Sequence, residues 1–260
     1  MHPILFQLGN FTIHSYGLLL ALGSLLGLWV LGLSAKRYGL DPDKVVNLAI
    51  WTLLAGIVGS RAAFVLLELP SFAAEPWRVL FFWEGGMVFY GGLALALLVG
   101  VPLALRDRLP MLVLLDCFAP AVAIGQAVGR IGCFAAGCCY GKASDLWCSV
   151  TFTDPHTLAP PGVSLHPAQL YSSAELTAVF LFLVWFRRKR QVFSGQIFFL
   201  YGLIHGIGRL IVEQFRGDWR GQPLTTWLTP TGAFALGLAV FSLFMLIILW
   251  QRQHRQKEGQ

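Results

Sequence analysis

The chain has 260 residues, of which 56% are hydrophobic and 12% are charged, and its mean hydropathy is +0.66. An average soluble domain has about 25% charged residues, so this composition excludes a soluble globular protein and indicates a membrane protein. The net charge is +6, but no pattern of basic and aromatic residues typical of a nucleic-acid reader accompanies it, so we expect no nucleic-acid partner.

Long apolar stretches divide the chain at intervals that suit membrane-spanning helices. The first lacks a basic leading region and exceeds the apolar core of a signal peptide, which is about 7–15 residues. Spans of about 20 residues are predicted near 13–35, 46–67, 89–105, 111–129, 172–186, 195–214 and 230–250. We therefore predict an all-α fold, a polytopic membrane helical bundle of about seven transmembrane helices, in a single integral membrane domain over residues 1–260.

The distribution of lysine and arginine predicts how the chain is oriented. Twelve of the 19 basic residues lie in the short segments that follow the first, third, fifth and seventh spans. Positive charge marks the cytoplasmic side of a membrane protein. The N-terminus is therefore expected outside, on the periplasmic side, and the C-terminus in the cytoplasm. The longer segments near 68–88 and 130–171 are expected on the periplasmic side.

The sixth span carries polar and ionisable residues along one predicted helix face. At 100° per residue they fall within a sector of about 120°; they are Tyr201, His205, Arg209, Glu213, Arg216 and Arg220. Two interpretations stay open: a structural ladder of ion pairs around Glu213, or surplus arginine charge that holds an anion such as lipid phosphate. Gly202 and Gly206 lie beside this sector with the spacing that lets a neighbouring helix approach closely.

Two glycine-rich stretches also mark candidate binding positions. In "GRIG", the glycines around Arg130 permit positive φ and close backbone approach at a helix end, which suits either an anion cradle or an interfacial arginine with turn glycines. In "GGMVFYGGL", glycine pairs flank Tyr90. They fit either non-helical backbone that lines a cavity or, for Tyr90, a place in the aromatic belt.

The cysteines raise the question of metal or disulfide chemistry. Cys133, Cys138, Cys139 and Cys148 fit no standard zinc-ligand spacing, so we expect no metal site and no cofactor. A disulfide that joins Cys133 or Cys148 to Cys138 or Cys139 and a role as small buried apolar residues both remain open.

Taken together, these stretches resemble the bacterial prolipoprotein diacylglyceryl transferases. "HSYGLLL", "GGMVFYGGL", "GRIGCF" with its later "YG", "HPAQLY" and "YGLIHGIGRLIVEQFR" occur in that family's order. The family transfers the sn-1,2-diacylglyceryl group of phosphatidylglycerol to the lipobox cysteine thiol of a prolipoprotein, forming a thioether and releasing glycerol phosphate. The resemblance implies a multi-pass protein of the bacterial inner (plasma) membrane. Its implied partners are phosphatidylglycerol, a prolipoprotein signal peptide with a lipobox cysteine, and the lipid bilayer.

The resemblance, together with the positions where this chain departs from the family, gives the expected site residues. Catalytic roles are expected for His205, Tyr90, Arg209 and Glu213. Substrate-binding roles are expected for Arg130, Arg216, Arg61, Tyr16, Gly91, Gly92, Gly132, Gly141, His166 and Gln169. Among these, Arg130 matches the arginine that the family uses on the phosphatidylglycerol head group.

Several positions depart from the family's pattern. The usual histidine before Gly-Gly-Leu is Tyr90, and the usual tyrosine four residues before Arg209 is His205. Cys133 and Cys138 replace an asparagine and an acidic residue, and the polar Ser/Gln pair that often begins the seventh span has no clear counterpart. The proton acceptor is therefore expected to be His205 or Tyr90. An anion or lipid transporter with an arginine-lined pathway, and a non-catalytic metal or redox protein, are the alternatives.

Overall fold

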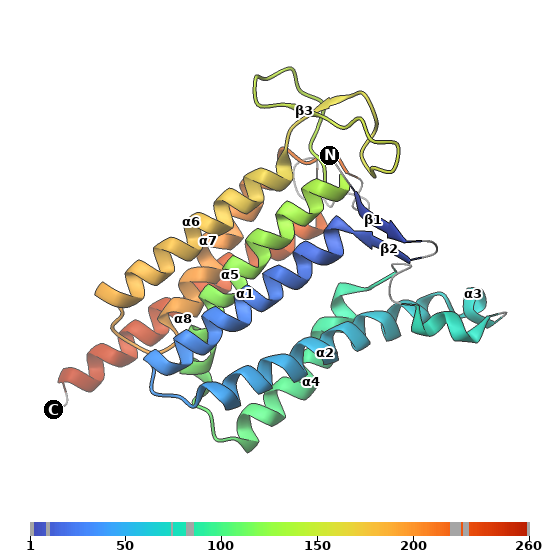
Figure 1. Cartoon of the computed structure of the whole chain (residues 1–260). Coiled ribbons are helices and arrows are strands. Elements are labelled where there is room, and N and C mark those ends of the chain that lie inside the picture. The colour runs from blue at the N-terminus through green and yellow to red at the C-terminus, as the bar shows by residue number, and fades with distance from the viewer. Residues whose placement is uncertain are drawn as a thin grey trace. The chain divides into compact units, whose positions relative to one another are not determined.

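The structure is a computed structural model that describes residues 3–8, 11–73, 75–81, 86–218, 225 and 229–258. Within these residues, seven helices are long and apolar enough to cross a membrane, which confirms the all-α polytopic fold (Figure 1). They are α1 (Ser15–Arg37), α2 (Pro42–Leu67), α4 (Phe89–Arg106), α5 (Met111–Ala136), α6 (Ala168–Lys189), α7 (Gln196–Glu213) and α8 (Pro230–Glu258).

Short elements connect or precede the long helices. An antiparallel hairpin, β1 (Ile4–Leu8) and β2 (Phe11–His14), leads into α1. A short helix α3 (Leu69–Ala73) and a 3₁₀ turn η1 (Pro76–Leu80) follow α2. Between α5 and α6, β3 (Val150–Thr151) pairs with β4 (Ser164–Leu165).

Two differences between the predicted and observed helix ends concern the candidate site. We expected the fourth span to end at residue 129, but α5 continues to Ala136, so "GRIG" is helical. The chain turns instead at Gly137, which has a φ of 75°. We also placed Arg216 on the face of the sixth helix, but α7 ends at Glu213 and Arg216 follows it in a short bridge. Arg220 lies outside the described residues.

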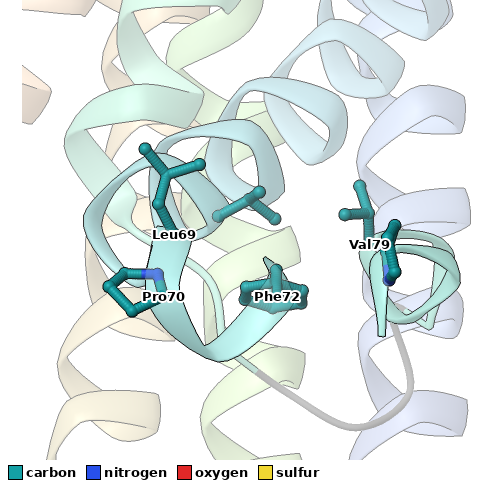
Figure 2. A pocket seen from close by; sticks show the side chains of 6 residues that line it. Leu69, Pro70, Phe72 and Val79 are labelled. Atoms are coloured by element: carbon teal, nitrogen blue, oxygen red, sulfur yellow. The ribbon is translucent and has the colours of Figure 1, made fainter. Parts of the chain in front are cut away.

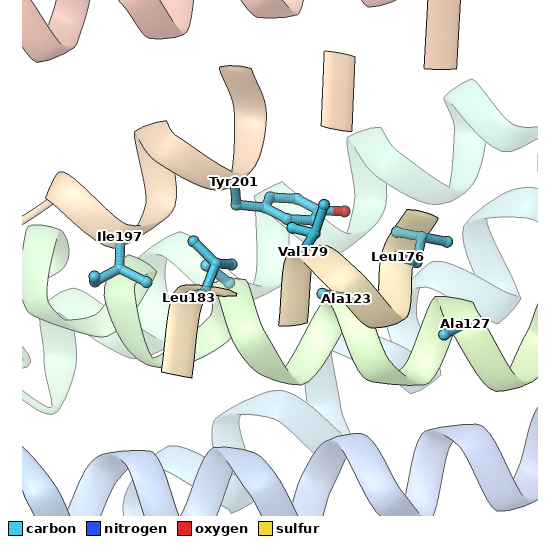
Figure 3. Close-up of a cluster of buried hydrophobic side chains, with 8 residues drawn as sticks. Ala123, Ala127, Leu176, Val179, Leu183, Ile197 and Tyr201 are labelled. Carbon is cyan, nitrogen blue, oxygen red and sulfur yellow. The ribbon is translucent and has the colours of Figure 1, made fainter. Parts of the chain in front are cut away.

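The helices group into two compact units, Met1–Leu31 with Leu115–Gln260, and Gly32–Leu114. The core of the first unit lies among α5, α6 and α7 (Figure 3). Small residues on α5 let the larger residues of α6 and α7 approach it. This core contains Ala119, Ala123, Ala127, Leu176, Val179, Leu183, Ile197 and Tyr201. The prediction of a single domain stays a prediction.

Glycines of α7 bring α8 close, as their spacing predicts. A Cβ on Gly202 would meet the Ser242 hydroxyl, and one on Gly206 would lie 2.8 Å from the Ala235 carbonyl oxygen. The two backbones therefore pack directly against each other, next to the sector of α7 that carries its polar residues.

Asp116 of α5 fixes where α7 begins. Its carboxylate is fully buried and accepts hydrogen bonds from the backbone N–H groups of Gly195 (2.7 Å) and Phe198 (2.9 Å). It also accepts one from the Gln191 side chain at 2.8 Å. A carboxylate at a helix N-terminus satisfies donors that have no partner within the helix, so Asp116 attaches the start of α7 to α5.

In the second unit, α2 and α4 lie side by side (Figure 1). A Cβ on Gly91 would collide with Ala63, and one on Gly92 would lie 2.7 Å from the Gly56 carbonyl oxygen. Non-helical backbone was one of the two interpretations of this stretch, and Gly91 and Gly92 both belong to the helix α4. Their small size lets α4 pack against α2.

The segment between α5 and α6 has a small core of its own. Phe152, Ala159 and Leu165 are buried together, and Phe134 and Tyr140 pack against them. This segment is therefore a folded element in the described structure, and it holds the chain that follows Gly137 in place.

Candidate active site

Arg130 carries an available positive charge in the first unit. It lies on α5, is half-buried, and makes no hydrogen bond or ion pair within the described part of the chain. Its charge interacts with Tyr16, Cys133 and Tyr201. A buried or half-buried guanidinium without a carboxylate partner is costly in a membrane protein, so this position suits a bound anion.

Gly132 brings the start of α1 close to Arg130. A Cβ there would lie 3.4 Å from the Tyr16 carbonyl oxygen and 3.2 Å from the Leu19 Cβ atom. Tyr16 itself is 41% exposed. Gly132 and Tyr16, both predicted to bind substrate, therefore lie next to each other. Contact of either residue with substrate stays a prediction.

His205 is held by a carboxylate that the sequence analysis missed. Its Nδ1 atom lies 3.2 Å from both carboxylate oxygens of Glu175 on α6. Its ring stacks on Tyr201, with centroids 5.4 Å apart and planes inclined by 9°. The Tyr201 hydroxyl donates to the Gln126 side chain at 3.2 Å. The signal available in the sequence was an acidic residue inside an otherwise apolar span.

Gly208 leaves the room that this carboxylate occupies. A Cβ on Gly208 would lie 2.6 Å from Oε1 of Glu175 and 2.7 Å from its Cγ atom. The Glu175 side chain therefore lies across the surface of α7 at this glycine, with its carboxylate turned to His205.

Arg209 and Glu213 form a buried ion pair at the end of α7. Arg209 Nη2 lies 3.1 Å from Glu213 Oε2, with side-chain exposures of 14% and 5%. The other carboxylate oxygen accepts hydrogen bonds from the hydroxyls of Thr229 (2.8 Å) and Thr231 (2.6 Å). The interpretation of Glu213 as an ion-pair partner is thus confirmed for Arg209. The two threonines, missed in the sequence, occupy the start of the seventh span.

Arg216 follows α7 and is 6% exposed. Its Nε and Nη2 atoms donate to Asp218 at 2.9 and 2.8 Å. Its Nη1 atom is buried and has no hydrogen-bond partner among the described residues. The Arg216 backbone forms a bridge with Gly141, so the segment after the cysteines is joined to the end of α7.

Gly141 is a point of close backbone contact. A Cβ there would collide with the His166 carbonyl oxygen and lie 2.9 Å from that of Phe215. His166 packs its ring on Phe215, with centroids 5.3 Å apart, and its Nδ1 lies 3.2 Å from the Tyr171 hydroxyl. Gly141 and His166 were predicted to bind substrate. In the structure they join the segments before α6 to the segment that follows α7.

We expect Gly141→Ala to destabilise this junction. The added methyl group has backbone atoms on more than one side, so the free energy of unfolding should fall by about 1–3 kcal/mol. Gly17→Ala is the matched control, because a Cβ at Gly17 of α1 meets nothing within 4 Å. Unfolding of both purified variants in detergent measures the effect. Equal stability of the two would contradict the assigned contact.

Gln169 fixes the turn that follows α5. It is fully buried, and its Nε2 atom donates to the Cys138 carbonyl oxygen at 2.8 Å. This hydrogen bond joins α6 to the segment that carries the cysteines. Contact of His166 or Gln169 with substrate stays a prediction.

Three cysteines next to this turn form a cluster. The sulfur atoms of Cys133, Cys138 and Cys139 all lie within 4.8 Å of one another. Hydrogen bonds from Cys133 and Cys138, together with the charge of Arg216, lower the pKa of the Cys139 thiol. Arg130 acts on Cys133, so the two arginines reach the same cluster from α5 and from the end of α7.

The remaining predicted residues belong to the second unit. Arg61 is 3% exposed, and its guanidinium donates to the carbonyl oxygens of Val79 (3.1 Å), Gly86 (3.3 Å) and Arg78 (2.6 Å). This arginine therefore holds the turn before α4. Tyr90 is 65% exposed at the start of α4. Catalytic or substrate contacts of Arg61, Tyr90, Gly91 and Gly92 stay predictions.

An apolar pocket of about 500 Å³ lies beside η1 in the second unit (Figure 2). It is lined by Val65, Leu69, Pro70, Phe72, Pro76 and Val79. Phe72 also lies under the Arg61 guanidinium, which is 5.5 Å from its ring centre. The pocket offers an apolar surface and no group that performs chemistry.

Comparisons with known proteins identify the chain's relatives. It is 35% identical to the phosphatidylglycerol--prolipoprotein diacylglyceryl transferase of Clostridium tetani over 95% of this chain and 98% of that protein. It is also 35% identical to the protein of the same name from Azotobacter vinelandii, over 97% and 96% of the two chains. The sequence model of the prolipoprotein diacylglyceryl transferases matches residues 3–257. The chain therefore belongs to the prolipoprotein diacylglyceryl transferase family.

Proposed function

We propose that this protein transfers the sn-1,2-diacylglyceryl group of phosphatidylglycerol to the lipobox cysteine of a prolipoprotein. Its relatives are named for this reaction. The observation that carries the proposal is Arg130, a half-buried arginine without an ion-pair partner in the described structure. Its charge reaches the cysteine cluster that the buried Arg216 also approaches. Two guanidinium groups near one small region suit the phosphate of a lipid head group.

In this reaction the arginines bind and stabilise the leaving group. The cysteine sulfur forms a bond to the carbon of the diacylglyceryl group that carries the phosphate. The bond from that carbon to the phosphate oxygen breaks. The electron pair stays on the oxygen, so glycerol phosphate leaves with an additional negative charge. We expect Arg130 and the Nη1 atom of Arg216, which has no hydrogen-bond partner among the described residues, to stabilise this charge.

His205 accepts the thiol proton in this proposal. Glu175 engages its Nδ1 atom at 3.2 Å, which orients the ring and leaves Nε2 for the substrate thiol. Arg209 follows one helical turn later, about 6 Å along the axis, so His205 and Arg209 share one face of α7. Tyr90 remains the second candidate for the base. It lies at the exposed start of α4 and, among the described residues, has no carboxylate partner that would orient it as Glu175 orients His205.

We expect Glu175→Gln to lower kcat about 100-fold with KM nearly unchanged, because the oriented base loses its carboxylate. Glu175→Asp should restore part of kcat, and Gly208→Ala should mimic the loss by displacing the carboxylate. Glu75→Gln is the matched control, because the Glu75 side chain is 51% exposed. An unchanged kcat in Glu175→Gln would remove Glu175 from the mechanism, and full activity of a His205→Phe/Tyr90→Phe variant would remove both candidate bases.

The proposal extends to the protein's place in the cell. We assign it to the bacterial inner membrane as a multi-pass protein with its N-terminus on the periplasmic side. The basic residues that follow alternate spans support this orientation. The signal peptide and its lipobox cysteine would then reach the site from the membrane and its outer face.

Purified protein with phosphatidylglycerol and a lipobox peptide tests the proposal. The expected product is the diacylglyceryl-peptide, detected by mass spectrometry together with glycerol phosphate. An absence of product with any phospholipid, combined with flux of phosphate anions across liposomes that contain the protein, would support the transporter instead.

A further inference from the structure

The three-cysteine cluster has the composition of a soft-metal site. Cys133 comes from the last turns of α5, whereas Cys138 and Cys139 follow the turn at Gly137. Their sulfur atoms all lie within 4.8 Å of one another. Sulfur ligands that converge at this distance favour soft metal ions over calcium or magnesium. Their sequence spacing matches no zinc pattern, so the turn itself brings them together.

The backbone around the cluster is built to hold this arrangement. Gly137 has a φ of 75°, and Cys139, which carries a side chain, has a φ of 62°. A non-glycine residue in the left-handed region is uncommon and often marks a functional position. The buried amide of Gln169 holds the Cys138 carbonyl oxygen at 2.8 Å. The two sulfurs of the turn are therefore directed to Cys133 by a fixed backbone.

The number of ligands narrows the choice of metal. No histidine, aspartate or glutamate of the described residues joins the three thiols in the cluster. Structural zinc almost always has four protein ligands, and catalytic zinc with three typically includes histidine among them, whereas this cluster supplies three thiols alone. Cuprous ion accepts soft thiolate ligands and is satisfied by three of them.

Positive charge next to the cluster favours thiolate ligands. When three thiols bind Cu⁺, three S–H bonds break, the protons leave to solvent, and the complex retains two negative charges. Arg130 acts on Cys133, and it has no ion-pair partner among the described residues, so its guanidinium offsets one of these negative charges. Arg216 acts on Cys139, although its charge is shared with Asp218. We propose that Cys133, Cys138 and Cys139 form a binding site for one cuprous ion. This proposal does not depend on the transferase reaction.

Anaerobic titration of the purified, reduced protein with Cu⁺ in competition with the chelator bathocuproine disulfonate tests the site. One equivalent of copper should be retained, and X-ray absorption should show three sulfur ligands. The Cys133→Ser, Cys138→Ser and Cys139→Ser variants should each bind Cu⁺ at least about 10-fold more weakly. Loss of a residue that only hydrogen-bonds a metal ligand already lowers metal affinity by about that factor, and loss of a ligand should cost at least as much.

The chain supplies its own matched controls in Cys117 and Cys148, which lie outside the cluster. A Cys117→Ser/Cys148→Ser variant should bind copper as the parent protein does. Unfolding temperatures of all variants distinguish loss of a ligand from loss of the fold, and a Cys133→Ala variant gives a second, apolar replacement. Equal copper affinity of the parent and the triple-serine variant would overturn the proposal. A disulfide within the cluster that survives treatment of the protein with a reductant would overturn the proposal as well.

Discussion

Replacement of Arg130 by alanine should reduce diacylglyceryl transfer by about 100- to 1000-fold, the usual cost of losing a group that stabilises developing charge. Arg130 is the arginine of the site that has no ion-pair partner within the described residues, so its charge is available to the phosphate. Arg209 and Arg216 are paired with Glu213 and Asp218. Product formation from phosphatidylglycerol and a lipobox peptide measures the effect.

Two further variants make this result specific. Arg130→Lys should retain part of the activity, because it keeps the charge and loses the planar fork that binds phosphate bidentately. Arg188→Ala removes an exposed arginine from the last turn of α6 and should act as the parent protein does. Full transfer by folded Arg130→Ala would show that the phosphate is bound elsewhere.

Glu213→Ala should have the largest effect on stability. This change leaves the Arg209 guanidinium buried without its partner, and breaking a buried pair in this way costs about 3–5 kcal/mol. It also removes the acceptor of the Thr229 and Thr231 hydroxyls, which attach the start of α8 to α7. The free energy of unfolding in mixed detergent micelles is the measurement.

The exposed pair of Arg78 and Glu75 provides the comparison for this prediction. Their side chains are 47% and 51% exposed, and such surface pairs contribute about 0–1 kcal/mol. Glu75→Ala should therefore leave unfolding nearly unchanged. Similar losses of stability for Glu213→Ala and Glu75→Ala would contradict a structural role for the buried pair.

Periodicity and hydropathy were enough to predict the spans, because each helix must satisfy its own backbone within the bilayer. They also predicted the packing glycines of α7. The end of α5 was missed because Gly132 is compatible with both a turn and a close helix contact, and only its neighbours Tyr16 and Leu19 decide between them.

The site was predicted less completely than the fold. Residues four apart on one helix lie on the same face, so the pairing of Arg209 with Glu213 could be predicted from their spacing in the sequence. Glu175 and Thr231 belong to other helices, and their approach to His205 and Glu213 depends on how α6, α7 and α8 pack. Likewise, the cysteine cluster depends on the positive φ values of the turn, which the sequence pattern does not encode.

Asp116 has a consequence for how the protein is made. Gln191, which donates to its carboxylate, lies 75 residues further along the chain, and the backbone donors of α7 are more distant still. While α5 enters the membrane during synthesis, this carboxylate therefore lacks every one of these partners. Asp116 is the sixth residue of α5, and an acidic residue within a membrane span is costly when it has no partner. The attachment of α7 to α5 is therefore a late step of membrane insertion.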